Sequence, residues 1–168
     1  MKTLPCLLLL SFFVFSCKTE NPAAKLAAEI TALEAEIGAD PGATQAKIPA
    51  LLAKYEEYVA LKEGSAEDKV KYLLRAGEMA ALVGQNGKSL GYYDQVISQF
   101  PDSPKAATAL FMKGYTLDDK LGRIDEAKAV YEEFLKKYPD DDFADDTQFL
   151  LKNLGKTEEE IIKQFEAK

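Results

Sequence analysis

The short stretch Gly87-Lys88-Ser89 is the first place where this chain could do chemistry, because these residue types end a phosphate-binding loop. Such a loop also needs a glycine five residues earlier and a preceding strand, so that backbone amides wrap a phosphate. Leu82 occupies that earlier position, and the residues before it have a helical pattern. We therefore interpret Gly84 to Gly87 as a turn between two helices.

A second candidate is a cluster of five aspartates, since carboxylates are the ligands that Ca²⁺ prefers. A calcium loop of the EF-hand kind needs alternating oxygen ligands, a central glycine and a final glutamate, and that spacing is absent. The simpler interpretation is that the aspartates cap a helix near 142–154 and favour its positive end. We therefore predict that this cluster holds no metal and no cofactor. Its members are Asp140, Asp141, Asp142, Asp145 and Asp146.

Catalysis by other side chains is disfavoured by the composition. The chain has no histidine, and 28 acidic residues on a helical surface produce many chance carboxylate pairs. General acid–base chemistry needs positioned partners with shifted pKa values, and no motif here supplies them. We predict that the protein is not an enzyme and has no catalytic residue.

The two cysteines, Cys6 and Cys17, both lie in an N-terminal segment with the pattern of a signal peptide. Lys2 precedes an apolar run from Leu4 to Phe15, which is shorter than the ~20 residues of a membrane-spanning helix. The run ends in Val14-Phe15-Ser16-Cys17, which resembles the lipobox of bacterial lipoproteins. The resemblance implies a signal peptide at 1–16, a lipid on Cys17 and a polar linker at 17–21. The alternative is an ordinary signal peptide with a cysteine at its boundary.

The net charge of the chain after cleavage of the signal peptide indicates which kinds of partner it can bind. Lys2 is the only charged residue of 1–16, so cleavage leaves 20 basic and 28 acidic side chains, a formal charge of −8. This excess of acid disfavours nucleic acid, which needs clustered Lys and Arg. Membrane attachment is therefore expected through the lipid. Lys18-Thr19-Glu20 lacks an aspartate of the inner-membrane type, which favours the outer membrane, facing the periplasm.

An internal repeat organises the rest of the chain. Tyr55, Tyr93 and Tyr131 recur at a spacing of 38 residues, and Phe100-Pro101 matches Tyr138-Pro139. In the upstream helices the same spacing aligns Leu73 with Phe111 and Phe149, and Leu74 with Met112 and Leu150. An unrelated helical bundle, which is the alternative, would not require this register.

Capping residues, prolines and glycines divide the repeats into helices. Asn21-Pro22 and Ser103-Pro104 each place a capping side chain before a first-turn proline. Ser65 and Thr157 begin sequences typical of capping boxes. We predict eight helices in four hairpins, near 22–37, 45–62, 66–83, 88–100, 104–120, 124–138, 142–154 and 158–167.

The third hairpin carries a family resemblance. It contains Leu110, Gly114, Ala127, Tyr131 and Pro139 and resembles a tetratricopeptide repeat, in the branch found in envelope lipoproteins of outer-membrane assembly and Tol-Pal systems. The resemblance implies an all-α, right-handed superhelical stack of about four helix-turn-helix hairpins over 22–168. Its best repeats are 66–101 and 104–139, and residues 142–168 form a C-terminal cap. The alanine-rich first helix is expected to pack within the chain, the alternative being a coiled coil.

The same resemblance implies a non-enzymatic protein–protein interaction scaffold, an accessory subunit of an envelope assembly or maintenance complex. Its partners would be envelope proteins or peptides, and no small-molecule substrate is expected. The alternative is an accessory lipoprotein that binds cell wall, glycan or a small ligand. The resemblance places the partner groove on the first helix of each hairpin, with candidates Lys71, Glu78, Thr108, Tyr115, Asp118 and Asp119. This mildly acidic set favours a partner with some basic character.

Overall fold

The computed structural model describes residues 21–40, 42 and 44–166, and every regular element within these residues is a helix. The predicted eight α-helices are present, and the all-α fold class is confirmed. The predicted signal peptide and Cys17 lie outside the described residues. The elements are α1 (Pro22–Ala39), α2 (Thr44–Ala60), α3 (Ala66–Leu82), α4 (Asn86–Gln99), α5 (Ala106–Tyr115), the π-helical turn η2 (Thr116–Lys120), α6 (Ile124–Lys137), α7 (Ala144–Asn153) and α8 (Glu158–Glu166).

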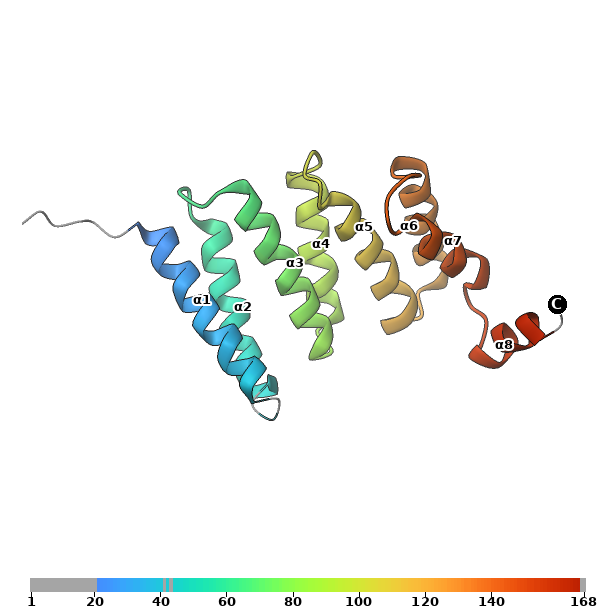
Figure 1. Ribbon diagram of the computed structural model, residues 1–168, viewed down its shortest axis with the longest axis horizontal. Helices are drawn as coiled ribbons and strands as arrows, with labels where there is room; N and C mark the ends of the chain where they lie inside the picture. The colour runs from blue at the N-terminus through green and yellow to red at the C-terminus, as the bar shows by residue number, and fades with distance from the viewer. Residues whose placement is uncertain (1–20, 41, 43, 167–168) are drawn as a thin grey trace, which may run out of the picture.

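The helices form one row of hairpins (Figure 1). Pairs α1–α2, α3–α4 and α5–α6 pack as hairpins, and α2–α3, α4–α5 and α6–α7 join one hairpin to the next. Successive helices run antiparallel, so α1, α3 and α5 all begin at the same edge of the row (Figure 1). We call this the starting edge. It contains Asn21 and the turns at 61–65, 100–105 and 138–143.

Local capping chemistry explains where the helices begin. Asn21 Oδ1 accepts from the Ala23 amide at 3.0 Å, and Ser65 Oγ accepts from the Asp68 amide at 3.0 Å, as predicted. Ser103 behaves differently: its hydroxyl accepts from the Lys105 amide and makes a tight turn. As a result α5 begins at Ala106, two residues after the predicted start.

The repeated tyrosines are core residues held against glycines. Tyr93 and Tyr131 are 0% exposed, and Tyr55 is 1% exposed. A Cβ atom at Gly77 would overlap the Tyr93 ring, and one at Gly114 would lie 2.6 Å from Cε1 of Tyr131. The glycines therefore let the two helices of a hairpin approach closely enough for the tyrosine to fill the space between them.

The predicted 38-residue alignment of the first helices is wrong by one residue. Gly77 and Gly114 are 37 residues apart, and the buried Leu73 corresponds to the buried Leu110 and not to Phe111. Phe149, the predicted third member, is 44% exposed. Buried positions therefore repeat every 37 residues from α3 to α5, while the second helices keep the spacing of 38.

The extra residue is absorbed in η2. At the end of α3, the Gln85 amide donates to the Ala80 carbonyl, five residues earlier, at 2.8 Å. At the end of η2, the Arg123 amide donates to the Leu117 carbonyl, six residues earlier, also at 2.8 Å. A single inserted residue is what a π turn accommodates within a helix. The turn restores the register before Tyr131.

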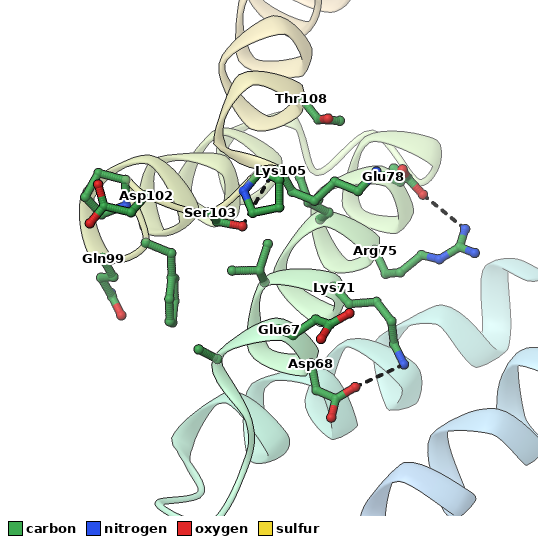
Figure 2. A pocket seen from close by; sticks show the side chains of 16 residues that line it. Glu67, Asp68, Lys71, Arg75, Glu78, Gln99, Asp102, Ser103, Lys105 and Thr108 are labelled. Carbon is green, nitrogen blue, oxygen red and sulfur yellow. Dashed lines mark hydrogen bonds and ion pairs between the residues drawn. The ribbon is translucent and has the colours of Figure 1, made fainter.

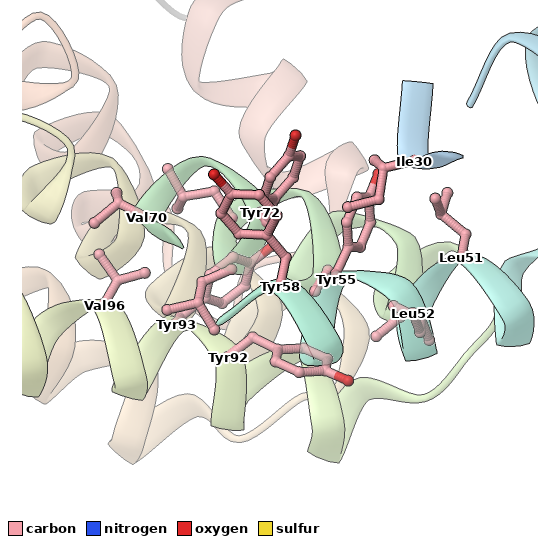
Figure 3. Packing of buried hydrophobic residues seen from close by; sticks show 14 of the residues in the cluster. Ile30, Leu51, Leu52, Tyr55, Tyr58, Val70, Tyr72, Tyr92, Tyr93 and Val96 are labelled. Carbon is pink, nitrogen blue, oxygen red and sulfur yellow. The ribbon is translucent and has the colours of Figure 1, made fainter. Parts of the chain in front are cut away.

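The hydrophobic core has two clusters, one mainly from α1 to α4 and one from α5 to α7, and Ile97 packs against both. Figure 3 shows the tyrosines of the first cluster. The Tyr55 and Tyr72 rings stack at 5.5 Å, and Tyr58 meets Tyr72 edge-on at 4.6 Å. The Tyr92 hydroxyl donates to Glu56 and thus ties α4 to α2.

The two ends of the row differ in how they are packed. At the N-terminal end, α1 packs on α2 through Ala23, Leu26 and Ile30, so intrachain packing of the first helix is confirmed. At the other end α8 projects away from α7 (Figure 1), and Ile162 is 55% exposed. The predicted C-terminal cap at 142–168 therefore stays a prediction, with α7 packed on α6 and α8 apart.

Candidate functional site

A groove of about 990 Å³ lies between α3 and α5, with the α4–α5 turn along one side. We call it the α3–α5 groove. Its apolar surface comes from Val70 and Leu74 of α3 and from Phe100 and Pro101 of the turn. Charged side chains surround these residues, with three basic and four acidic groups (Figure 2), namely Lys71, Arg75, Lys105, Glu67, Asp68, Glu78 and Asp102.

The wall formed by α3 carries two internal ion pairs. Lys71 Nζ lies 3.5 Å from Asp68, and Arg75 lies 3.3 Å from Glu78 (Figure 2). Lys71 also lies 4.4 Å from the centre of the Tyr72 ring. These pairs join residues one helical turn apart and are largely exposed, so they hold the side chains in place while contributing little stability.

Asp68 connects this wall to the core. Its carboxylate accepts from the Ser65 hydroxyl at 2.8 Å and from the Tyr58 hydroxyl at 3.1 Å. The hydrogen bond from Ser65 holds the pKa of Asp68 below its usual value, although partial burial opposes this. Asp68 therefore stays ionised at neutral pH and keeps Lys71 beside it.

The opposite wall is positioned by the inter-hairpin turn. The Phe100 amide donates to the Val96 carbonyl and ends α4, and the Ser103 turn leads into α5. Lys105 extends from this turn across the groove toward α3 (Figure 2). Thr108 stands one turn further along α5 and completes the lining.

The six predicted groove residues do not form one surface. Lys71, Glu78 and Thr108 line the α3–α5 groove. Tyr115 lines a separate hollow of about 290 Å³ between α5 and α7. Binding of a partner by these four residues stays a prediction.

The remaining two lie on η2 and face other residues. The Asp118 carboxylate accepts from the Tyr131 hydroxyl at 3.4 Å, and burial raises the pKa of Asp118. Asp119 pairs with Lys120 at 2.6 Å. Asp118 follows Gly114 by four residues, so it lies on the side of the helix that packs against Tyr131.

Several groove residues were absent from the prediction, namely Arg75, Lys105 and the turn from Gln99 to Pro104. Arg75 follows Lys71 by one helical turn, so the helical period could have identified it. The turn residues could not be found this way, because their position depends on how one hairpin packs on the next.

The motifs discounted as chemistry have structural roles. Ser89 is fully buried in the first turns of α4, and the helix α3 precedes the turn, as predicted. The predicted turn from Gly84 to Gly87 is too long, because α4 begins at Asn86 and includes Gly87. Asp141 Oδ1 accepts from the Phe143 amide at 3.0 Å, just before α7. Among the described residues, no group of three or more acidic, cysteine or histidine side chains is arranged to hold a metal ion. None of the helices in the described ranges has the length and apolarity to cross a membrane.

Fold and groove together define an array of stacked helical hairpins with a groove between successive hairpins. A family model described as a tetratricopeptide repeat matches residues 108–141. The match covers the third hairpin, from Thr108 through η2 and α6 to the turn that follows. No curated protein matches the chain.

Proposed function

We propose that this protein is a non-enzymatic scaffold of the bacterial cell envelope that binds a segment of another protein in the α3–α5 groove. Tetratricopeptide repeats generally mediate protein interactions. The observation that carries the proposal is the groove itself, whose accessible apolar surface comes mainly from Phe100, Pro101 and Pro104 of the turn, since Val70 and Leu74 are only 3% and 9% exposed, and is bordered by charges of both signs. Such a surface suits an amphipathic segment, with apolar side chains on the apolar surface and polar ones at the rim.

Anchoring to the membrane is the second part of the proposal. The lipobox-like residues Val14-Phe15-Ser16-Cys17 support cleavage before Cys17 and lipidation of that residue. Several acyl chains hold a protein firmly, at about 0.8 kcal/mol per buried methylene. We place the protein at the periplasmic face of the outer membrane, as an accessory subunit of an assembly or maintenance complex.

Lipidation is tested by labelling cells with a fatty acid and fractionating them. The wild-type chain should carry the label and sediment with the outer membrane. The variant Cys17→Ser should lose both properties. An unlabelled wild-type chain in the soluble periplasmic fraction would contradict lipid anchoring. The N-terminal segment would then be an ordinary signal peptide.

Binding is tested by affinity purification of the unlipidated domain, exported behind a cleavable signal. The paired variant Glu67→Lys/Asp102→Lys reverses two acidic groups on the two walls of the groove and should repel a partner with basic character. Asp125→Lys/Glu132→Lys on α6 is the matched control, because both side chains are exposed and Glu132 pairs only loosely with Lys128, at 3.9 Å. The wild type and the control should recover the same envelope protein, and the groove variant should lose it.

Sedimentation with peptidoglycan distinguishes the scaffold from the alternative function, which is glycan or cell-wall binding. Glycan sites use exposed aromatic faces. Tyr55, Tyr72 and Tyr92 line a hollow of about 280 Å³, yet each is at most 5% exposed. We therefore expect no co-sedimentation, and binding to peptidoglycan without recovery of a protein would contradict the scaffold.

A further inference from the structure

The interface between α3 and α5 recurs one hairpin further along the chain, between α5 and α7, and the turns that lead into α5 and α7 have the same geometry. Ser103 accepts a hydrogen bond from the Lys105 amide at 3.2 Å, and Asp141 accepts one from the Phe143 amide at 3.0 Å. The backbone angles of Lys105 and Phe143 also agree, with φ values of −95° and −88° and ψ values of 0° and 3°. Phe143 is therefore the structural equivalent of Lys105.

The helices that face these two turns correspond as well. Gly77 of α3 and Gly114 of α5 hold the same place against the tyrosine of their hairpin. Counting back three residues from each glycine pairs Leu74 with Phe111. Leu74 lines the α3–α5 groove, and Phe111 lines the hollow between α5 and α7. The two spaces therefore lie at equivalent positions of successive hairpins.

The chain fills the second of these spaces with an aromatic side chain of its own. Phe143 stacks on Phe111, with ring centres 4.4 Å apart and planes inclined by 11°. Only about 290 Å³ remains there, and no residue of the turn at 138–143 lines it. Between α3 and α5, Leu74 and Lys105 stand in place of the stacked pair, and the groove measures about 990 Å³. The larger groove is thus a position at which the aromatic filling of the next interface is missing.

The surface left in the α3–α5 groove suits an aromatic ring. Phe100 is half-buried, and Pro101 and Pro104 are exposed, so the turn offers flat apolar faces on which a ring packs well. Leu74 is 9% exposed behind them. Lys105 is exposed and forms no ion pair with the other described residues, so its flexible side chain is able to move away from α3.

From the matching turns, the stacked pair and the difference in volume, we infer that the α3–α5 groove receives a phenylalanine or tyrosine side chain of the partner, at the place that Phe143 occupies in the next interface. This inference names the anchor residue of the partner segment and so rests on the proposed function. Buried aromatic side chains are frequent anchors of protein interfaces, because they cover much apolar area with few rotatable bonds.

The inference is tested by adding N-acetyl-phenylalanine amide to the folded domain and recording methyl NMR signals. N-acetyl-alanine amide is the matched probe, because it lacks only the ring. The phenylalanine probe should shift the methyl signals of Val70 and Leu74 in a saturable way, and the alanine probe should not. Val130 on α6 is the internal control, since it does not line the groove and should respond to neither probe.

A variant that fills the groove gives a second test. Leu74→Phe/Lys105→Phe copies the pair of Phe111 and Phe143, so it should fold and unfold at the wild-type temperature or higher. It should lose the response of Val70 to the probe, and recovery of the envelope partner should fall at least about ten-fold. Lys105→Ala is the control, because it removes the lysine without filling the space, and it should keep both properties.

The outcomes separate the inference from the proposed function. Absence of a phenylalanine-specific shift at Val70 in the wild type would overturn the inference, as would an unchanged response or undiminished recovery in the folded Leu74→Phe/Lys105→Phe variant. Equal losses in Lys105→Ala would overturn it too, because the lysine and not the open space would then be required. If the double variant does not fold, Lys105→Phe alone decides by the same criteria. A wild type that responds to the probe and recovers no envelope protein would support the aromatic site and contradict the proposed function.

Discussion

Single glycines determine how closely the helices of each hairpin approach. Gly77 and Gly114 face Tyr93 and Tyr131 at distances that leave no room for a methyl group. Both tyrosine rings are fully buried, so they cannot move aside without disturbing the core. The small residue and the aromatic residue therefore act as a pair, although they lie on different helices.

Gly77→Ala should destabilise the protein by about 1–3 kcal/mol, because the added methyl forces the buried Tyr93 ring to shift. Gly91→Ala is the control, since Gly91 is exposed within α4 and a methyl there meets no atom within 4 Å. The Gly91→Ala change should stabilise the protein by about 0.5–1 kcal/mol, because alanine has a higher helix propensity than glycine. Urea denaturation measures both, and equal effects would contradict the proposed contact.

The three repeated tyrosines differ in what their hydroxyls bind. The Tyr55 hydroxyl donates to Glu34 at 2.5 Å. The Tyr93 and Ser89 hydroxyls are close enough to interact, but neither makes a hydrogen bond of good geometry within the described residues. An unpaired buried hydroxyl is destabilising.

Tyr55→Phe should therefore cost about 1.5 kcal/mol, whereas Tyr93→Phe should be neutral within about 0.5 kcal/mol or stabilising. Both variants keep the aromatic ring and its packing, so each is a control for the other. Denaturation midpoints in urea compare them directly. A larger loss for Tyr93→Phe would show that its hydroxyl has a partner.

At the scale of elements, most predictions that depend on neighbouring residues were successful, although Ser103 forms a turn before α5 instead of capping it. Ser65 and Asn21 cap their helices, and Gly84 ends α3 with a φ of 74°, because these functions depend on neighbouring residues. The register of α5 was missed, because Leu110 and Phe111 are both apolar and either could face the core. Only the pairing of Gly114 with Tyr131 distinguishes them, and that contact joins different helices. The groove wall from Phe100 to Lys105 was missed for the same reason.

Deleting Asp119 tests the role of η2. The deletion should convert the π turn into an ordinary helical turn like the end of α3, with stability changed by less than about 1 kcal/mol. Deleting the exposed Ala129 within α6 is the control, and it should unfold the hairpin because Tyr131 and Phe134 would both leave the core. Circular dichroism and urea denaturation report the outcome. An equal loss of stability from both deletions would contradict the conclusion that η2 contains one inserted residue.

At the scale of the whole molecule, buried tyrosines link stability to alkaline pH. Burial raises the pKa of Tyr93 to about 12, and burial with a nearby carboxylate raises the pKa values of Tyr55, Tyr92 and Tyr131 above 10. Raised values mean that the folded protein favours the neutral phenol. Their contribution to stability is therefore complete below pH 10 and is lost as the pH rises through 10 to 12.

We expect cooperative unfolding between about pH 10 and pH 12, with helix loss and tyrosinate absorbance rising together. Titration followed by circular dichroism and near-ultraviolet absorbance measures this. Gradual ionisation of all tyrosines near pH 10 with the helices intact would contradict their burial.

The central claim is that the row of hairpins binds another protein through the α3–α5 groove. The most direct measurement is photo-cross-linking in cells from Thr108 within the groove, compared with Ala129 on the outer face of α6. The account predicts one defined envelope protein cross-linked from position 108 and none from position 129, with the product lost in Glu67→Lys/Asp102→Lys. The same product from both positions, or from position 129 alone, would contradict it.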